Sequence, residues 1–294
     1  MKEYSFYPGC SSEKMASAAN MENSVHHMCE ILGIKLKEID DWNCCSASIG
    51  YAGGGQLPRM ALTARNFALS QAQSPGKDVV ATCAACWLAL RETQERIEEE
   101  PVVKAQLDTV LKEANLTYDG HLKPRHMVEV LIEDVGWDQL KAKVKKPLKG
   151  LKVAGYVGCQ TNRPFGVCGD NFEDPQYLDR MIEATGATAV PFPKKVACCG
   201  GALAFSENEN ACKLIKEILQ SAVDNGAEAI VTPCPVCQLN VEVYQGKVNK
   251  MFNTRFNIPV LYYSQLFVLA WGGSWEQAAL NQQVVPATAL QRFA

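Results

Sequence analysis

The order of hydrophobic and polar positions predicts that strands and helices alternate along the first half of the chain. Apolar residues recur every three or four positions over residues 13–32, as in a helix with one buried face, and Gly33 is placed to cap that helix. Residues 34–39 alternate apolar and charged side chains, as a strand does. The other elements predicted in this half are strands at 4–7 and 78–82 and helices at 58–73, from Cys83 to Arg96 and at 124–135.

The second half repeats this order. It contains predicted strands at 151–157, 188–192 and 228–232 and predicted helices at 175–185, at 207–225 and after residue 234. Alternating strands and helices favour a parallel sheet flanked by helices. We therefore predict an α/β fold of two duplicated domains, residues 1–146 and 147–294, related by pseudo-two-fold symmetry. The charged helical segment 95–116 is interpreted as an insertion in the first domain.

The segment between the two predicted domains has a composition of its own. Residues 141–149 contain five lysines, a proline and few large apolar side chains. Such a segment is typical of a solvated linker, and a docking surface for an acidic partner is the alternative. We interpret it as the linker.

Length and composition limit the classes of protein to which the chain can belong. A chain of 294 residues suits two domains of about 150, and 47% hydrophobic and 21% charged residues are typical of a globular protein. The net charge of −3 does not favour a nucleic-acid partner. Residues 1–8 do not have the apolar core segment of a secretory signal, and the longest apolar stretch, residues 260–271, is too short to cross a bilayer. We expect a cytoplasmic protein without a transmembrane segment, docked in a complex.

Ten of the 13 cysteines form two matching groups of five. Cys10 and Cys159 are 149 positions apart, Cys44 and Cys198 are 154 apart, and Cys83 and Cys234 are 151 apart. Three anchors that repeat at nearly one interval, half the chain length, indicate a duplicated domain. The first group is Cys10, Cys44, Cys45, Cys83 and Cys86, and the second is Cys159, Cys198, Cys199, Cys234 and Cys237.

Four of these cysteines lie just past predicted strands: Cys10, Cys83, Cys159 and Cys234. In parallel α/β sheets, ligands collect beyond the carboxyl ends of the strands. Cysteines that are distant in the sequence are therefore expected to converge at one edge of the sheet in each half.

The spacing of the cysteines bears on the kind of site. Thiols stay reduced in the cytosol, so clustered cysteines indicate metal ligands or redox groups rather than disulfides. A Cys-x-x-Cys pair at a helix start faces backbone N–H groups that favour thiolates, but this pattern fits zinc, a redox thiol pair or an iron–sulfur cluster. The adjacent pairs Cys44-Cys45 and Cys198-Cys199 bridge two irons of a cluster more easily than they chelate one small ion.

The number of sulfur donors in each group also favours a cluster over a single metal ion. Structural zinc takes four ligands and a cubane cluster takes four cysteines, whereas each group here offers five. Either one thiol is free or the cluster is larger or more open than a cubane. The soft donor set favours iron–sulfur, with zinc and a catalytic thiol as the alternatives.

The remaining candidate residues are given structural roles. Cys29 and Cys212 lie on helical faces and are interpreted as core residues. Cys168 is interpreted as a loop thiol without a role, and none of the four histidines is given a metal role. Trp42 and Trp87 lie next to cysteine motifs and are expected to pack around the site, with substrate contact as the alternative.

The cysteine pattern carries a resemblance to a known family. It reads Cys-x33-Cys-Cys-x37-Cys-x2-Cys and then Cys-x38-Cys-Cys-x34-Cys-x2-Cys, and it resembles the paired cysteine-rich "CCG" domains of the heterodisulfide reductase B subunit. The same domain pair occurs in iron–sulfur subunits of glycolate oxidase, in lactate-utilisation proteins and in thiol:fumarate reductases. The supporting motifs are Tyr7-Pro8-Gly9-Cys10, Asp41-Trp42-Asn43-Cys44-Cys45, Thr232-Pro233-Cys234-Pro235-Val236-Cys237 and Pro259-Val260-Leu261-Tyr262-Tyr263-Ser264-Gln265-Leu266.

The resemblance implies an oxidoreductase acting on sulfur groups. It implies that the two groups of five cysteines each bind a non-cubane [4Fe-4S] cluster and that the two clusters face each other. A disulfide lying between them would be split reductively, one sulfur going to an iron of each cluster, with electrons arriving singly. The implied partners are an iron–sulfur protein resembling the C subunit of heterodisulfide reductase, a flavoprotein resembling its A subunit, and a disulfide or thiol substrate.

One position departs from the family pattern. Ser46 stands after Cys44-Cys45 where the family has glycine, and a side chain there puts a direct transfer of the methanogen reaction in doubt. The related complexes of sulfur-oxidising bacteria, which act on other sulfur compounds, are therefore a second possibility. An electron-relay iron–sulfur subunit of a flavin-dependent dehydrogenase, of the glycolate or lactate type, is a third.

Overall fold

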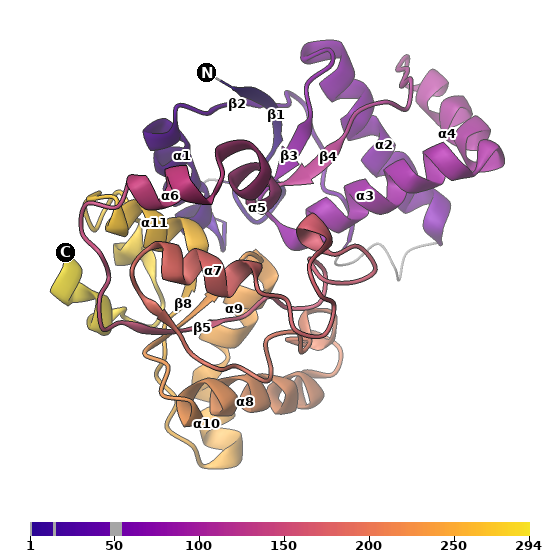
Figure 1. Ribbon diagram of the computed structural model, residues 1–294. Coiled ribbons are helices and arrows are strands. Elements are labelled where there is room, and N and C mark those ends of the chain that lie inside the picture. The colour runs from indigo at the N-terminus through magenta and orange to yellow at the C-terminus, as the bar shows by residue number, and fades with distance from the viewer. Residues whose placement is uncertain (1, 14–15, 48–54) are drawn as a thin grey trace.

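The computed structural model describes residues 2–13, 16–47 and 55–294 (Figure 1). This part of the chain contains two four-stranded parallel sheets, each flanked by helices. The first sheet has the order β2-β1-β3-β4, with β1 Glu3–Tyr7, β2 Lys35–Glu38, β3 Val79–Ala81 and β4 Pro124–His126. The second has the order β6-β5-β7-β8, with β5 Lys152–Gly155, β6 Thr188–Ala189, β7 Ala229–Thr232 and β8 Val260–Tyr262. The predicted fold class is confirmed.

The helices follow the strands in both halves. Those of the first half are α1 Ala19–Leu32, α2 Gln56–Gln73, α3 Ala84–Glu99, α4 Pro101–Glu113, α5 Met127–Glu129 and α6 Trp137–Ala142. Those of the second half are α7 Tyr177–Ala184, α8 Asn208–Asp224, α9 Pro235–Val243, α10 Gln245–Phe252 and α11 Tyr263–Ala270. Among these described helices, none combines the length and the apolar character that crossing a membrane requires.

Local sequence explains where several elements begin and end. The α1 helix ends at Gly33, which adopts a left-handed conformation (φ 69°) and donates its N–H to the carbonyls of Cys29 and Glu30, as predicted. In the first sheet, β1 is central and Tyr4–Tyr7 are buried, whereas β2 at the edge carries the exposed charges of Lys35, Lys37 and Glu38. Charged side chains are a common way to keep an edge strand from pairing with another chain.

The strand order creates a crevice in each half. The chain leaves β1 to form β2 on one side and returns to form β3 on the other, and β5 is flanked by β6 and β7 in the same way. Such a switch point, at the carboxyl ends of two neighbouring strands, is where open α/β sheets bind ligands. Cys10 and Cys83 follow β1 and β3, and Cys159 and Cys234 follow β5 and β7. The predicted placement of these cysteines beyond the strands is confirmed.

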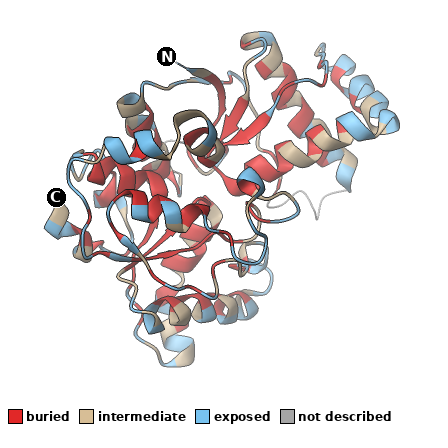
Figure 2. Ribbon diagram, viewed as in Figure 1, coloured by how far each residue is buried: buried red, intermediate tan, exposed pale blue. Residues whose placement is uncertain are grey.

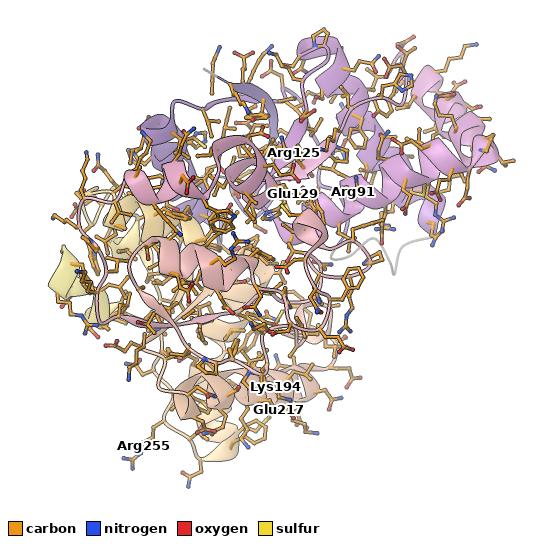
Figure 3. All side chains as sticks on the ribbon, in the orientation of Figure 1. Arg91, Arg125, Glu129, Lys194, Glu217 and Arg255 are labelled. Atoms are coloured by element: carbon orange, nitrogen blue, oxygen red, sulfur yellow. The ribbon has the colours of Figure 1, made fainter. Side chains whose placement is uncertain are left out.

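The two halves share one hydrophobic core (Figure 2). Helix α1 packs against α11, and the buried hydroxyls of Ser24 and Ser264 lie 2.7 Å apart in this contact. The indole N–H of Trp271 donates to the backbone carbonyl of Leu140 at 3.0 Å. Arg91 of the first half (labelled in Figure 3) lies 5.0 Å from the ring centroid of Phe165 in the second. These contacts fix how the two crevices face each other.

Two predicted helices need correction. The helix predicted over residues 13–32 begins only at Ala19, and residues 14–15 lie outside the described part. Residues 124–126, predicted as the start of a helix, form β4, which pairs with β3. The helical stretch begins at Met127, so His126 ends a strand instead of lying in a helix.

Tertiary contacts explain why residues 124–126 form a strand. Arg125 is buried, and its guanidinium makes an ion pair with Asp134 at 2.8 Å, so its charge does not oppose burial. Glu129 accepts a hydrogen bond from the His126 N–H at 2.7 Å, and this bond starts the helix one residue later.

The lysine-rich segment before the second sheet is held by the fold. Its first residues belong to α6, the N–H groups of Lys145 and Lys146 both donate to the Ala270 carbonyl at 2.9 Å, and Leu148 is buried. The domain boundary after residue 146 falls in this segment and stays a prediction.

Candidate functional site

Each cysteine group divides into a buried trio and an outer pair. The trios lie beneath the surface, and the side chains of all six residues are at most 4% exposed. In the outer pairs, Cys10 and Cys198 are exposed, and Cys44 and Cys159 are half-buried. The trios are Cys45, Cys83 and Cys86 in the first half and Cys199, Cys234 and Cys237 in the second. The same division in both halves follows from the duplicated fold.

The sulfur atoms are close together within each group. Cys10 Sγ lies 3.6 Å from Cys44 Sγ, and Cys45 Sγ lies 3.5 Å from Cys86 Sγ. In the second group, Cys159 contacts Cys198 and Cys199 contacts Cys237 in the corresponding way. All 13 cysteines are free thiols. The structure therefore brings together the five predicted residues of each group without forming a disulfide.

The two groups also meet each other. The thiols of Cys83 and Cys234, which follow the central strands β3 and β7, interact across the boundary between the halves: the Cys234 thiol raises the pKa of Cys83, and the thiols of Cys237 and Cys83 lower the pKa of Cys234. Next to this contact lies a cavity of about 110 Å³, which all five cysteines of the second group line. Ala47 and Ala85 of the first half also line it, whereas the cysteines of the first group do not. The cavity therefore combines the sulfurs of the second group with small apolar side chains of the first half.

Two tyrosines position the adjacent cysteine pairs. Tyr7 donates its hydroxyl to the carbonyl of Asn43, at 2.8 Å, and Tyr156 donates to the carbonyl of Ala197, at 2.7 Å. Each acceptor is the residue directly before an adjacent cysteine pair, and both tyrosine side chains are fully buried. Sequence reasoning missed this role, although the repeated pattern Tyr-x-Gly-Cys could have indicated it.

Two glycines let the backbone approach the buried sulfurs. Gly9 and Gly158 precede Cys10 and Cys159 and have φ angles of +78° and +73°, which favour glycine. A Cβ on Gly9 would come within 2.7 Å of Cys86 Sγ. A Cβ on Gly158 would come within 3.1 Å of Cys237 Sγ. The loops that carry the outer cysteines therefore rest directly on the buried trios.

Hydrogen bonds favour one anionic sulfur in each outer pair. The pKa of Cys44 is lowered to about 2 by hydrogen bonds from Cys10 and Cys45 and from the Ser46 N–H, whose nitrogen is 3.4 Å away. The pKa of Cys198 is lowered to about 2 in the same way, by Cys159, Cys199 and backbone N–H groups. Because the thiolate is the metal-binding form of cysteine, each outer pair has one sulfur ready to bind at neutral pH. In the second group the pKa of the buried Cys234 is lowered as well, by hydrogen bonds from Cys237 and Cys83.

Ser46 occupies a conformation that favours glycine. Its φ is +58°, and it corresponds to Gly200 (φ +72°), since the N–H of each residue points to the first cysteine of the preceding pair. A left-handed non-glycine residue costs about 1 kcal/mol. The departure from the family pattern therefore adds backbone strain but keeps the N–H to Cys44 Sγ contact.

This strain predicts that substitutions at Ser46 and Gly200 change the free energy of unfolding in opposite directions. Ser46→Gly should raise the free energy of unfolding by up to about 1 kcal/mol, because relief of strain exceeds the added freedom of the unfolded chain. Gly200→Ala should lower it by more than about 1 kcal/mol, because the new Cβ would lie 3.1 Å from Ala211 Cα. Urea unfolding measures both. Equal effects of the two substitutions would contradict the assigned equivalence of these positions.

The other residues singled out from the sequence lie around the groups. Cys29 and Cys212 are buried among apolar residues, which confirms their interpretation as core. Cys168 is exposed in a short 3₁₀ turn. Trp87 is buried and donates its indole N–H to Glu129 at 3.0 Å, and Trp42 is half-buried beside Tyr7. Both tryptophans therefore pack next to cysteine loops.

The donor set fits a soft, multinuclear group better than a single ion. Ten thiols, in pairs and trios, supply only sulfur. Within residues 2–13, 16–47 and 55–294, no three His, Cys, Asp or Glu side chains form the compact set that one metal ion would need. Thiolates without imidazole or carboxylate ligands suit iron–sulfur clusters. The division of each group gives such a cluster buried ligands on one side and accessible ones on the other.

Comparison with protein families gives two matches on this chain. The model of the cysteine-rich domain called CCG matches residues 4–91 and 153–242, one range in each half. The two ranges contain all ten cysteines of the two groups. The chain therefore belongs to the family of cysteine-rich CCG-domain proteins.

Within that family, several relatives resemble the chain over most of its length. It is 32% identical over 86% of its residues to the B subunit of the ferredoxin:CoB-CoM heterodisulfide reductase of Methanosarcina mazei, covering 85% of that protein. It is 31% identical over 95% of its residues to a protein of Archaeoglobus profundus described as like the heterodisulfide reductase B subunit, covering 94%. The resemblance to the heterodisulfide reductase B subunit, stated from the cysteine pattern, is confirmed.

A further relative carries a different description. The chain is 35% identical over 98% of its residues to the 8-methylmenaquinol:fumarate reductase membrane anchor subunit of Wolinella succinogenes, covering 99% of it. Among solved structures, a hypothetical protein from Helicobacter pylori superimposes with a TM-score of 0.77 at 16% identity, over 97% of this chain and 52% of that one. That likeness shows the fold alone. The relatives from Wolinella and Methanosarcina are subunits of reductases, so the broader interpretation as a redox subunit holds.

Proposed function

We propose that the chain is the iron–sulfur subunit of a heterodisulfide reductase-like complex, acting in disulfide and thiol chemistry between two facing non-cubane [4Fe-4S] clusters. The observation that carries the proposal is the interaction of Cys83 with Cys234, through which the two groups of free thiols meet. The first cluster would be held by Cys10, Cys44, Cys45, Cys83 and Cys86, and the second by Cys159, Cys198, Cys199, Cys234 and Cys237.

The surrounding residues would support this chemistry in three ways. Clusters of this kind, when bound, accept and release single electrons. The buried trios hold their side of each cluster away from water, because their side chains are almost fully buried. The second outer pair, Cys159 and Cys198, lines the cavity. Ala47 and Ala85 add apolar side chains there, beside which a neutral disulfide can lie without losing a charge interaction.

A second candidate is an electron-relay subunit, and the Wolinella succinogenes relative favours it. That protein belongs to a reductase named for a quinol and fumarate, not for a disulfide. On this alternative the two cysteine groups pass electrons between partner subunits, and no substrate binds in the gap. Partners resembling the C and A subunits of heterodisulfide reductase, and the cytoplasmic location, belong to the leading proposal and are likewise open to test.

Anaerobic purification with iron, sulfide and zinc analysis tests the cofactor. We expect about eight irons and eight sulfides per chain, as two four-iron clusters would give. Zinc in place of iron would overturn both candidates. A change in the cluster's paramagnetic signal on adding a thiol would support binding in the gap. An unchanged signal in an iron-replete protein would instead favour the relay, and identification of co-purifying chains then names the partners.

A further inference from the structure

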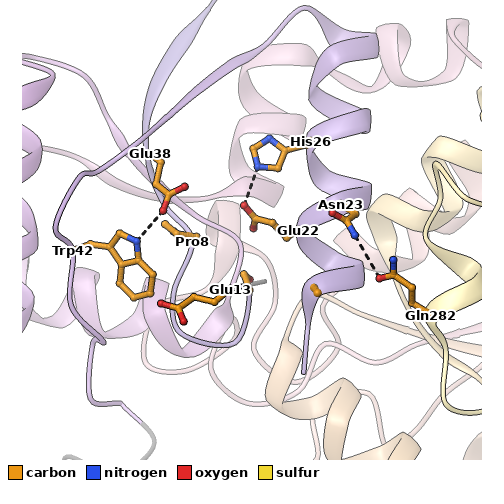
Figure 4. A pocket seen from close by; sticks show the side chains of 10 residues that line it. Pro8, Glu13, Glu22, Asn23, His26, Glu38, Trp42 and Gln282 are labelled. Carbon is orange, nitrogen blue, oxygen red and sulfur yellow. Dashed lines mark hydrogen bonds and ion pairs between the residues drawn. The ribbon is translucent and has the colours of Figure 1, made fainter. Parts of the chain in front are cut away.

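A second cavity lies at the edge of the first half, where Gln282 of the second half also lines it, and none of its lining residues belongs to a cysteine group (Figure 4). Its volume is about 700 Å³, which is within the range of small-molecule sites. The residues that matter for its chemistry are Ser12, Glu13, Glu22, His26, Glu38 and Trp42, and we call it the Trp42 pocket. They come from the loop after β1, from α1, and from the end of β2 and the loop that follows it.

The Trp42 pocket is acidic. Three carboxylates, those of Glu13, Glu22 and Glu38, line it, and none of the described lining residues is a lysine or an arginine. His26 is the one basic group of this lining, and its Nε2 lies 2.8 Å from Glu22 Oε1. Like charges gathered around one space repel each other, so a cation in that space is favoured and an anion is excluded.

Buried polar atoms in the lining lack partners. The hydroxyl of Ser12, a residue only 4% exposed, has no hydrogen-bond partner among the described residues. The second carboxylate oxygen of Glu22, Oε2, is also buried without a partner in that part of the chain, while Oε1 faces His26. An unpaired buried polar group costs about 1–3 kcal/mol. Both atoms can accept hydrogen bonds, so the ligand that satisfies them should carry several donors.

The aromatic wall of the pocket is held in place. Trp42 donates its indole N–H to Glu38 Oε1 at 3.0 Å, and its ring meets the Tyr7 ring edge-on, with centroids 5.5 Å apart and an interplanar angle of 84°. A fixed indole beside carboxylates is a favourable site for a cation, because the ring face attracts positive charge. The unpaired hydrogen-bond acceptors, the negative charge and the aromatic ring therefore all indicate the same kind of ligand, a cation with several hydrogen-bond donors.

We propose that the Trp42 pocket binds an organic cation, an alkylguanidinium or alkylammonium group, with Glu22 and Ser12 as its hydrogen-bond acceptors. The inference does not depend on what the cysteine groups hold. The pocket nevertheless lies next to the first cysteine group, because Pro8 and Ser12 of the lining flank Cys10 on the same loop. Occupation of the pocket would therefore restrain the loop that carries the first outer cysteine.

Binding of agmatine, a small alkylguanidinium, to the anaerobically purified protein tests the proposal by calorimetry. We expect saturable binding that weakens at high salt, and no binding of butylurea, a neutral alkylurea that lacks both positive charges of agmatine. Glu22→Gln keeps the shape but removes the charge, and should weaken agmatine binding by about tenfold to a hundredfold. Circular dichroism and thermal melting of the variant check that it is folded.

Glu30→Gln is the matched control. Glu30 lies on the same helix and contacts His27 Nδ1 at 3.1 Å, as Glu22 contacts His26, but it is not among the residues that line the pocket. It should bind agmatine as the unaltered protein does. Absence of saturable binding, equal binding of butylurea, or equal weakening by both substitutions would overturn the proposal.

A competition experiment then distinguishes the source of the cation. A short peptide with one internal arginine that displaces agmatine points to a side chain supplied by a partner chain. A peptide that fails to displace it points to a free amine. Either result, after saturable and Glu22-dependent binding, supports the cation site.

Discussion

Replacing Cys198 with alanine should remove the iron bound by the second cysteine group and leave the first group loaded. Cys198 is in the outer pair of its group, and its low pKa, about 2, keeps its sulfur in the thiolate form that binds metal. Its contacts are with Cys159 and Cys199, within its own half. Iron content should therefore fall from about eight to about four per chain. Iron analysis and the paramagnetic spectrum measure this loss.

The matched control is Cys168→Ala. Cys168 is also exposed in the second half but belongs to neither group, so this substitution should leave the iron content unchanged. Cys234→Ala is a useful contrast. The sequence alone predicts that it affects only the second group, but the contact of Cys234 with Cys83 means that it should also disturb the first. An iron count unaffected by Cys198→Ala would refute the assignment of the second group.

The convergence of the cysteines could be predicted from the sequence for a physical reason. Cys10, Cys83, Cys159 and Cys234 each follow a short apolar run, and the strand period of these runs is a local property. Once the strands are parallel, their carboxyl ends share an edge, so cysteines far apart in sequence meet without any knowledge of packing. The repeat interval then predicts that the second group of cysteines converges in the same way.

Other elements depend on contacts that a local pattern does not contain. Residues 124–126 are Pro-Arg-His, a composition that is unusual for a strand. They pair with β3 because Asp134 neutralises the charge of Arg125. The sequence does not predict β8 and α11, since residues 260–270 are buried throughout and mostly apolar, and the single polar pair Ser264-Gln265 gives them no strand or helix period.

The meeting of the two groups also depends on packing between the halves. The contact of Cys83 with Cys234 exists because α1 packs against α11 and one core joins both halves. The same is true of the apolar wall that Ala47 and Ala85 add to the cavity. No spacing within one half encodes these contacts, so the sequence predicts two sites, and the structure places them side by side.

Replacing Gly9 with alanine should reduce the iron content of the first group as well as its stability. The left-handed φ of +78° costs about 1 kcal/mol for any residue with a Cβ. In addition, the new Cβ would lie 2.7 Å from Cys86 Sγ, so the sulfur must move. Cys86 is buried beside Cys45, whose sulfur is 3.5 Å away, and has little room to move without changing the ligand geometry.

Gly76→Ala separates the two effects. Gly76 has a similar φ, +69°, but an added Cβ there has no neighbour within 4 Å. The free energy of unfolding of both variants should therefore fall by about 1 kcal/mol, because alanine is strained at a left-handed φ. Only Gly9→Ala should also lose iron, up to about half of the total, as the first of two clusters. If both variants retain full iron, Cys86 does not need its present position to bind metal, and the first group would have to be reassigned.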